Sequence, residues 1–584
     1  MKDSFFLIVF AAVCTACVSE RTWEQPAVLY ADNRIEIKAV EFHSDSTVVH
    51  FTASGRPGST FRLRENAYIV GDRLERGHIM DMHGISSDKW TAYPAVGKAD
   101  FRVCFFPVRG TTKSLDFIEP NGWMAYGIHD SSKPFRIKRT DDSHMAVRDE
   151  GHFFIEGTAH VSGRFEGRRH PQVIRYPGFN AFQDRNVQAT LVEDDGSFAF
   201  DIPVEHPVLS SLNAGQGLWP YFYVRAGSSL HMTIDSLGTV HYPSGVRCRR
   251  LLDWMSNSRP GISFNADSVF SRDNFVDYII HRYRFSREEA HLLKHYFRMK
   301  AASDELLQQL RRSRSKRDED SFRDPADYPA TRALDPKDWS YFTLAHEAYY
   351  LVNYYTPLVY DYKALNQAKQ MAEADKAVFG TDEPSVFIQA SIANKPGARI
   401  LVSQTGEAAD SLLNLRKAEI TSPYLRQRFT SYADRLLSGE EKYYELPQCK
   451  GSEIFSKLIE PFKGKWVYID FWSTSCYPCM SGIEASEKLR KQIKTMEDFE
   501  LVFITGDNLS PKIAYDDYTA AQLSGENSFR IPAAQYSLLE ALFNFTAIPH
   551  NELVAPDGRI LNAAFLPRLE EPSFLERLKE IIAK

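Results

Sequence analysis

Apolar and polar residues alternate along the first quarter of the chain, between about residues 23 and 134. The alternating runs are rich in β-branched and aromatic residues, and clusters of Gly, Pro, Asp and Ser separate them. The clearest runs are Arg34–Phe42, Thr47–Phe51, Phe101–Phe106 and Leu115–Ile118. Short strands separated by turn signals favour an antiparallel β-sandwich, which we expect over residues 18–150.

A second set of alternating runs follows, and we assign it to a second small β domain over residues 151–245. Asp195-Gly196 separates two of these runs. Because glycine accepts the positive φ angle that a tight turn requires, we expect a hairpin at this dipeptide.

From about residue 251 the apolar positions recur at the period of a helix. Ser286 and Glu289 have the spacing of a capping box, and Phe285 is placed to act as the hydrophobic staple beside it. Residues 311–330 carry both charge signs and two prolines, which predicts a solvated linker between helices. We expect a helical module over residues 246–446.

The last part of the chain, residues 447–584, alternates strands of the buried type with helical patterns. The expected elements are strands at Trp466–Trp472 and Glu500–Gly506, helices at 512–523 and 533–543, a strand pair about Asp557-Gly558 and a final helix at 572–584. This order predicts an α/β layer arrangement.

Composition and charge agree with a multidomain globular protein. The chain has 584 residues, enough for about four domains of roughly 150 residues each. Hydrophobic residues make up 43% and charged residues 25%, which excludes wholesale disorder. The 70 Lys and Arg residues against 76 Asp and Glu residues give a net charge of −6, so no nucleic-acid partner is expected.

The first residues have the order of a secretory signal. Lys2 is followed by the apolar run Phe5–Ala12, which is too short to span a bilayer, and small residues precede Cys17. This ending resembles a bacterial lipoprotein signal over residues 1–17, in which Cys17 becomes the lipid-modified N-terminus. A plain cleaved signal and a buried N-terminal strand are the alternatives. We expect the protein outside the cytoplasm, tethered to a membrane by lipid.

The chemistry of the chain centres on Cys476 and Cys479, three residues apart at the start of a predicted helix. At this spacing two cysteines lie near enough to form a disulfide. The first sulfur faces unsatisfied backbone N–H groups and the positive end of the helix dipole, which stabilise its thiolate. Pro478 suits the first helical turn, where its missing N–H costs little. The spacing therefore predicts thiol–disulfide exchange, with Cys476 attacking and Cys479 resolving the mixed disulfide.

Metal binding is the main structural alternative for such side chains. A zinc site needs a second pair of ligands beside the CxxC motif, and Cys449 has no paired partner. His291 and His295 are spaced to chelate zinc from one helix face, but no third ligand is evident in the sequence. The segment His78–His83 offers thioether and imidazole groups that suit copper, although Met on a strand more often fills a core. We expect no metal and no cofactor other than the Cys476–Cys479 disulfide.

The segment GKWVYIDFWSTSCYPCMSGIEA resembles TlpA-like thiol–disulfide oxidoreductases of the thioredoxin superfamily. The likeness covers about residues 447–584 and is greatest to secreted multidomain lipoproteins of the Bacteroides type. It implies a C-terminal thioredoxin-like domain behind the β-sandwich modules and the helical middle module.

The resemblance also assigns roles residue by residue. Cys476 matches the nucleophile, Cys479 the resolving thiol, and Asp470 the buried acid that relays a proton to it. Ile548-Pro549 matches the cis-proline loop that presents backbone to the substrate. Trp472 matches an aromatic residue beside the site and is expected to bind the substrate. Tyr477, which lies between the cysteines, is expected to contact the substrate as well.

These assignments predict a disulfide reductase on the periplasmic side of a bacterial membrane, kept reduced by a membrane electron donor. Its partners would be proteins with disulfides or thiols. An oxidant or isomerase would use the same cysteines, and a binding lipoprotein would hold them as a structural bridge. Peroxidase activity is disfavoured because Ile469 and Ser473 stand where a peroxiredoxin-like PxxxTxxC pattern has Pro and Thr.

Three further cysteines, Cys104, Cys248 and Cys449, remain in the expected mature chain. Because three is an odd number, at least one thiol stays free or pairs between chains. The sequence assigns none of them a role.

Overall fold

The structure of the chain, a computed structural model, contains two compact units. One unit is Met1–Thr140 with Asn257–Phe285, and the other is Asp141–Ser256 with Ser286–Lys584. The described residues are 21–120, 122–167, 170–178, 186–215, 218–258, 269–316, 328–356, 367–393, 407–440, 442–562, 566, 569 and 574–582. The expected signal peptide and its Cys17 lie outside these residues, so both stay predictions.

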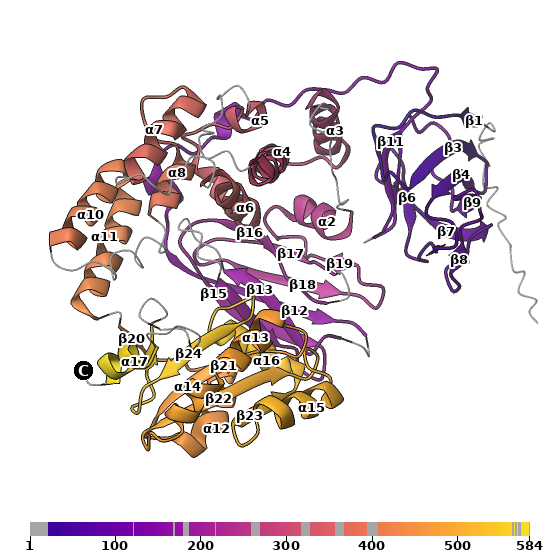
Figure 1. The fold of residues 1–584 in the computed structure, drawn as a ribbon. Helices are drawn as coiled ribbons and strands as arrows, with labels where there is room; N and C mark the ends of the chain where they lie inside the picture. Colours follow the sequence, from indigo (N-terminus) through magenta and orange to yellow (C-terminus); the bar gives the residue numbers. More distant parts are fainter. Residues whose placement is uncertain are drawn as a thin grey trace, which may run out of the picture. The chain divides into compact units, whose positions relative to one another are not determined.

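The first unit contains a nine-stranded antiparallel sheet, drawn in indigo in Figure 1. Its order is β1-β3-β4-β9-β7-β6-β10-β11-β2. The strands are β1 (Arg21–Glu24), β2 (Tyr30–Ala31), β3 (Ile35–Phe42), β4 (Thr47–Ser54), β6 (Tyr68–Val70), β7 (Arg76–His83), β9 (Lys98–Phe105), β10 (Leu115–Ile118) and β11 (Met124–Ile128). A separate ladder joins β5 (Thr60–Phe61) and β8 (Thr91–Ala92). Strands β3, β4, β9 and β10 coincide with the four runs that alternation predicted.

Strands that are not neighbours in the order of this sheet pack against each other. Phe51 on β4 lies 4.8 Å from Phe117 on β10, measured between ring centroids, and Phe105 on β9 lies 6.3 Å from Phe117. All three side chains are almost fully buried. The inward-facing side chains of strands far apart in the sheet order therefore form one core, as a sandwich requires.

Helix α3 (Val269–Arg282) also belongs to the first unit. Asp116 on β10 is fully buried, and Arg282 donates to it at 3.2 Å while the Tyr278 hydroxyl donates at 2.8 Å. A buried carboxylate needs such donors, since leaving it unpaired would cost several kcal/mol. Periodicity assigned this helix to the module at 246–446, because a helical pattern does not reveal which sheet the helix will cover.

The second unit begins with further short sheets. Their strands are β12 (Gly157–Phe165), β13 (Val173–Gly178), β14 (Asn186–Leu191), β15 (Ser197–Val204), β16 (Val208–Ser211), β17 (Tyr221–Val224), β18 (Ser229–Ile234) and β19 (Val240–His241). They form a sheet of order β15-β12-β18-β19 and the pairs β13-β14 and β16-β17.

The hairpin expected at Asp195-Gly196 is only partly present. Gly196 has the expected positive φ of 84°, and the turn is closed by a hydrogen bond from Glu193 to Ser197 at 2.8 Å. The strands on its two sides do not pair with each other, because β14 pairs with β13 and β15 pairs with β12. The prediction of a paired hairpin was therefore wrong, since alternation fixes the buried face of a strand and not its neighbour.

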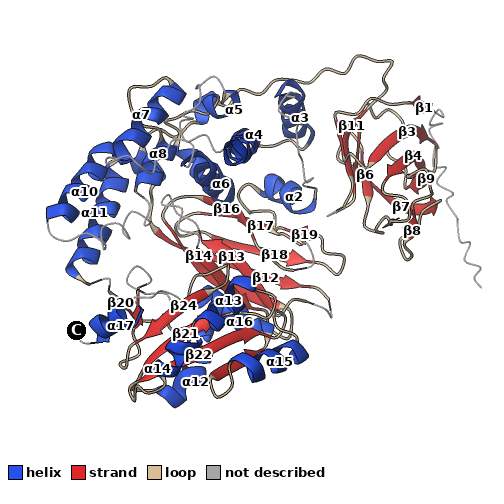
Figure 2. Ribbon diagram, in the orientation of Figure 1, coloured by secondary structure: helices blue, strands red, loops and turns tan. Residues whose placement is uncertain are grey.

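The second unit also contains a set of helices, coloured blue in Figure 2. They are η1 (Ser143–Met145), α1 (Glu150–Phe153), α2 (Arg249–Asn257), α4 (Arg287–Lys316), α5 (Pro329–Arg332), η4 (Trp339–Thr343), α6 (Ala345–Tyr355), α7 (Gln367–Phe379), α8 (Val386–Ile392), α10 (Glu407–Glu419) and α11 (Pro423–Ser438). The predicted capping box begins α4: the Ser286 hydroxyl accepts from the Glu289 N–H at 3.3 Å, and the Glu289 carboxylate accepts from the Ser286 N–H at 2.7 Å. Helix α4 continues to Lys316, so the expected linker at 311–330 begins as helix.

A six-stranded mixed sheet of order β20-β25-β24-β21-β22-β23 forms the end of the chain. The strands are β20 (Tyr443–Tyr444), β21 (Trp466–Phe471), β22 (Phe499–Gly506), β23 (Asn527–Ile531), β24 (His550–Val554) and β25 (Ile560–Leu561). The helices are α12 (Lys450–Ile459), η6 (Glu460–Phe462), α13 (Tyr477–Ala485), α14 (Glu487–Ile493), α15 (Lys512–Gln522), α16 (Ala533–Leu542) and α17 (Phe574–Ile582). Strand β23 was not predicted, because only Ile531 of its five side chains is buried.

Helices cover both faces of this sheet, as the continuous apolar run of β21 predicts. Tyr468 and Trp472 pack with α13, α15 and α17 on one face. Val467, Ile469 and Phe471 pack with α12 and α16 on the other face. Successive side chains of a strand point to opposite faces, which explains this division.

Among the helices that the structure describes, none combines the length and the apolar composition needed to cross a bilayer.

Candidate active site

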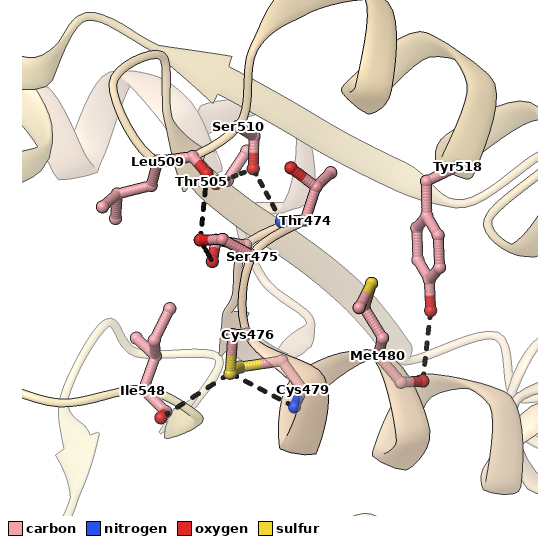
Figure 3. The surroundings of a disulfide bond; sticks show 11 residues. Thr474, Ser475, Cys476, Cys479, Met480, Thr505, Leu509, Ser510, Tyr518 and Ile548 are labelled. Carbon is pink, nitrogen blue, oxygen red and sulfur yellow. Dashed lines mark hydrogen bonds between the residues drawn. A yellow bond between two sulfur atoms is a disulfide. The ribbon is translucent and has the colours of Figure 1, made fainter.

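The segment after β21 turns sharply before α13, and hydrogen bonds from a neighbouring strand end hold it (Figure 3). The Thr474 N–H donates to the Ser510 hydroxyl at 3.0 Å, and that hydroxyl lies 2.8 Å from the Thr505 hydroxyl at the end of β22. The Cys476 N–H donates to the Ser473 carbonyl at 3.2 Å. The end of β22 therefore fixes the place where α13 begins.

Cys476 and Cys479 form a disulfide at the start of α13. Cys476 is the N-cap residue of the helix, and its sulfur accepts a hydrogen bond from the Cys479 N–H at 3.3 Å. Pro478 lies in the first turn, where the helix would leave its N–H without an intrahelical acceptor. The first sulfur thus faces the positive end of the helix dipole, as the spacing predicted.

The two sulfur atoms differ in accessibility. The side chain of Cys479 is 2% exposed, whereas that of Cys476 is half-buried. Tyr477 between them is 77% exposed. A protein that approaches this surface meets Cys476 and Tyr477 first, and Cys479 lies behind them.

The Ile548–Pro549 peptide bond is cis, and the Ile548 carbonyl oxygen lies 3.7 Å from the Cys476 sulfur (Figure 3). Strand pairing explains this proximity, because Phe471 at the end of β21 pairs with His550 at the start of β24. The two segments that leave these paired ends therefore meet. Pro549 is exposed and Ile548 is half-buried, so the loop is accessible beside the disulfide.

Asp470 lies on β21, and only 7% of it is exposed. Its negative charge acts on Tyr518 of α15: burial chiefly raises the pKa of Tyr518 to about 12, and Glu484 and Asp470 contribute to the rise. The Tyr518 hydroxyl donates to the Met480 carbonyl of α13 at 3.1 Å. A buried carboxyl at the end of this strand agrees with the prediction, and its role in proton transfer stays a prediction.

Trp472 has no exposed surface. Its ring lies 5.2 Å from the ring of Tyr518 and 6.1 Å from that of Tyr515, measured between centroids. This position is that of a core residue beneath α15. The side chain therefore presents no surface to a substrate in this structure, although the sequence placed it beside the site.

His550 and Glu552, which are not among the residues expected at the site, form a hydrogen-bonded pair next to the Ile548–Pro549 loop. Their side chains approach to 2.7 Å, and Glu552 is 3% exposed. Residues two apart in a strand point to the same face, so a His and a Glu at this spacing in a predicted strand were a usable signal.

His291 and His295 of α4 lie in a buried cluster of charged side chains. One ligating atom from each of Asp142, His291 and His295 lies within 4.8 Å of the others, so the third group that the sequence could not reveal is present. Arg298 donates to both Asp142 oxygens at 2.8 and 2.9 Å, and His295 lies 2.8 Å from Asp338. The carboxylates already have cationic or imidazole partners, and we assign the cluster a structural role.

The segment His78–His83 lies on β7. In the described part of the chain it contributes to no group of three or more metal-ligating side chains.

The remaining described cysteines are not paired: Cys104 is half-buried, Cys248 is buried and Cys449 is exposed. Burial raises the pKa of both the Cys248 and the Cys104 thiols, so these two thiols do not ionise readily. The structure gives no role to any of the three.

No protein-family model matches this sequence, and no curated protein sequence matches it. Solved structures similar to part of it include the thioredoxin domain of a thiol-disulfide oxidoreductase from Bacteroides vulgatus. That structure is 19% identical, with a TM-score of 0.19, and the match covers 21% of this chain and 84% of that one. A thiol:disulfide interchange protein from Bacteroides sp. is also 19% identical, with a TM-score of 0.19, and the match covers 22% of this chain and 78% of that one. TM-scores of 0.19 support no conclusion about function, which therefore has to be inferred from the geometry of the site.

Proposed function

We propose that this protein is a thiol–disulfide oxidoreductase that acts through Cys476 and Cys479. One observation carries the proposal: the accessible sulfur of Cys476 caps α13 and accepts the Cys479 N–H, while Cys479 is buried one turn behind it. This arrangement separates an attacking sulfur from a resolving sulfur. A structural bridge would not require either the helix start or the difference in accessibility.

In the reducing direction, the Cys476 thiolate attacks one sulfur of a substrate disulfide. The substrate S–S bond breaks, a mixed disulfide forms, and the departing substrate thiolate takes up a proton. The Cys479 thiolate then attacks the Cys476 sulfur, which forms the Cys476–Cys479 bond and releases the second substrate thiol. Two electrons pass from the protein to the substrate, and the disulfide in Figure 3 is the product state.

The surrounding residues have proposed roles in this cycle. The Cys479 N–H and the helix dipole stabilise the Cys476 thiolate, and Asp470 takes the proton of Cys479 when that thiol attacks. The Ile548–Pro549 loop and Tyr477 contact the substrate protein. These roles are supported by the position of the loop 3.7 Å from the sulfur and by the exposure of Tyr477.

We further propose that the protein acts as a TlpA-like reductase on the periplasmic side of a bacterial membrane. Cys17 would carry the lipid, and a membrane electron donor would return the disulfide to the dithiol. The sequence pattern of residues 1–17 and the likeness around the CxxC motif support this placement.

Trapping with the Cys479→Ala variant tests the proposal. Without a resolving thiol, the reduced Cys479→Ala variant should accumulate mixed disulfides with model proteins that carry disulfide bonds. The Cys476→Ala variant should accumulate none. The wild-type protein should reduce insulin with dithiothreitol as the electron source. A variant that traps nothing, together with a wild type that leaves insulin intact, would support the binding-protein alternative.

The reduction potential of the Cys476–Cys479 couple decides the direction. A value near the roughly −270 mV of thioredoxin would support a reductase, and a value near the roughly −120 mV of DsbA would support an oxidant.

A further inference from the structure

A pair of ionisable side chains lies next to the Ile548–Pro549 loop and is not used in the exchange cycle. His550 follows Pro549 directly, and its Nε2 atom lies 2.7 Å from the Oε1 atom of Glu552. In β24 these two residues pair with Phe471 and Ile469 of β21, so both side chains lie on the face covered by α12 and α16. A carboxyl group on an apolar sheet face is unusual and needs a physical explanation.

Burial makes Glu552 depend on His550. Glu552 is 3% exposed, and burial raises the pKa of its carboxyl group while the interaction with His550 opposes the rise. The charge of Glu552 also raises the pKa of Tyr444 on β20, which burial has already raised. A buried carboxylate is stable only when a cation or a hydrogen-bond donor compensates it. The hydrogen bond between Glu552 and His550 meets this need, and the same bond holds the His550 ring in one orientation.

The orientation of His550 matters because its ring helps to close the loop. The ring stacks on Phe545, with 4.2 Å between centroids and 14° between the ring planes. Phe545 precedes the Ile548–Pro549 bond and His550 follows it, so the stack joins the two ends of this short segment. The Phe471 ring supports the stack from β21, at 5.8 Å from the His550 ring.

The segment closed in this way is the one that meets the reactive sulfur. The Ile548 carbonyl lies 3.7 Å from the Cys476 sulfur, a contact marked by a dashed line in Figure 3. The Ile548 side chain packs against both apolar clusters of the sheet. A shift of the loop would therefore change the backbone surface beside Cys476 without changing the start of α13.

We infer that His550 and Glu552 are positioning residues that hold the Ile548–Pro549 loop in the conformation that binds protein substrates. This inference rests on the proposed function, because it concerns substrate binding at the same disulfide. The pair acts through the loop and touches neither sulfur in the exchange step. Its loss should therefore weaken substrate binding and leave the reactivity of Cys476 toward small molecules intact.

The test compares Glu552→Gln, His550→Ala and the double variant in the full-length protein. With dithiothreitol as reductant, KM for insulin should rise about tenfold in each variant while kcat stays within about twofold. The double variant should be no worse than the worse single variant, because the two residues act as one unit. The rate at which iodoacetamide alkylates reduced Cys476 should stay within about twofold of the wild type.

His43→Ala is the matched control, because the His43 side chain directly after β3 of the first unit pairs with Glu41 of that strand at 3.0 Å. It should leave KM unchanged. If His550→Ala fails to fold, as judged by far-UV circular dichroism, Glu552→Gln and His550→Gln carry the test because both conserve side-chain volume.

The failure of this inference can be distinguished from the failure of the proposed function. If insulin KM stays the same in folded variants of the pair, or if kcat falls while KM does not change, the inference about His550 and Glu552 is overturned and the proposed function stands. If wild-type Cys476 is no more reactive than a thiol in the unfolded chain and insulin is not reduced, the proposed function fails and the inference fails with it.

Discussion

At the scale of single residues, the site depends on two sulfur atoms in different surroundings. Cys476 is accessible and accepts a backbone N–H at 3.3 Å, whereas Cys479 is 2% exposed. A helix start stabilises a thiolate because its N–H groups carry partial positive charge, and burial opposes a thiolate because it removes water. The two thiols of the reduced protein should therefore differ in acidity.

The acidity of Cys476 can be measured in the reduced Cys479→Ala variant. Only the thiolate reacts with iodoacetamide, so the alkylation rate rises with pH and is half-maximal at the thiol pKa. We expect this midpoint about one unit or more below the free-thiol value of about 8.5. The same variant unfolded in urea should return to about 8.5, and equal midpoints in the two states would contradict the stabilised thiolate.

Residue identity also shows where sequence patterns stop being informative. Cys476 and Cys479 carry their chemistry in their spacing, and the structure places them at a helix start as expected. Trp472 carries no such information: an aromatic residue next to a site fits a rim and a core equally well, and packing with Tyr515 and Tyr518 buries it. Its exposure depends on residues more than 40 positions away in the chain.

At the scale of elements, local signals predicted most of the helices and strands. The capping box of α4 is an example, because both of its hydrogen bonds join residues three apart. Predictions at the scale of elements failed where a neighbouring strand decides the outcome. Strand β15 pairs with β12 instead of β14, and the half-buried β23 joins the sheet beside β22. Local patterns contain no information about such partners.

The capping box gives an element-scale prediction. Ser286→Ala removes the acceptor for the Glu289 N–H at the start of α4 and should lower the free energy of unfolding by about 0.5–2 kcal/mol. Urea denaturation followed by circular dichroism would measure the change. Arg287→Ala, at the next exposed position, should change stability by no more than about 0.5 kcal/mol. Equal effects of the two substitutions would show that the cap contributes nothing.

At the scale of the whole molecule, charged side chains join segments that are distant in the sequence. In the second unit, Asp142 and Asp338 meet His291, His295 and Arg298 of α4, and Lys294 lies 3.8 Å from Asp142. Hydrogen bonds from His291 and Arg298 hold the pKa of Asp142 below its ordinary value, although burial alone would raise it. Burial lowers the pKa of His295 to about 4. The folded state therefore holds His295 in its neutral form.

This network predicts a stability that depends on pH. The unfolded chain binds a proton at His295 below about pH 6.5, and the folded protein does so only below about pH 4. The contribution of neutral His295 to the free energy of unfolding is therefore complete above about pH 6.5. Roughly 2–4 kcal/mol of stability is lost progressively as the pH falls to 4. Urea unfolding of the full-length protein at pH 7, 6, 5 and 4 would measure this slope. In His295→Gln, the slope of the free energy of unfolding against pH should correspond to about one fewer proton over this range. An unchanged slope would contradict the neutral state of His295 in the folded protein.

Local patterns in the chain were sufficient to predict the periods of the elements, the position of the α4 cap and the pair of cysteines at a helix start. Each of these is set by residues within a few positions of one another, and local sterics and hydrogen bonding act at that range. Three contacts could not be predicted from local patterns: Ile548 lies beside Cys476, His550 stacks on Phe545 and bonds to Glu552, and α3 covers Asp116. Burial and strand pairing decide such contacts, because the water excluded from a side chain depends on every segment that packs around it.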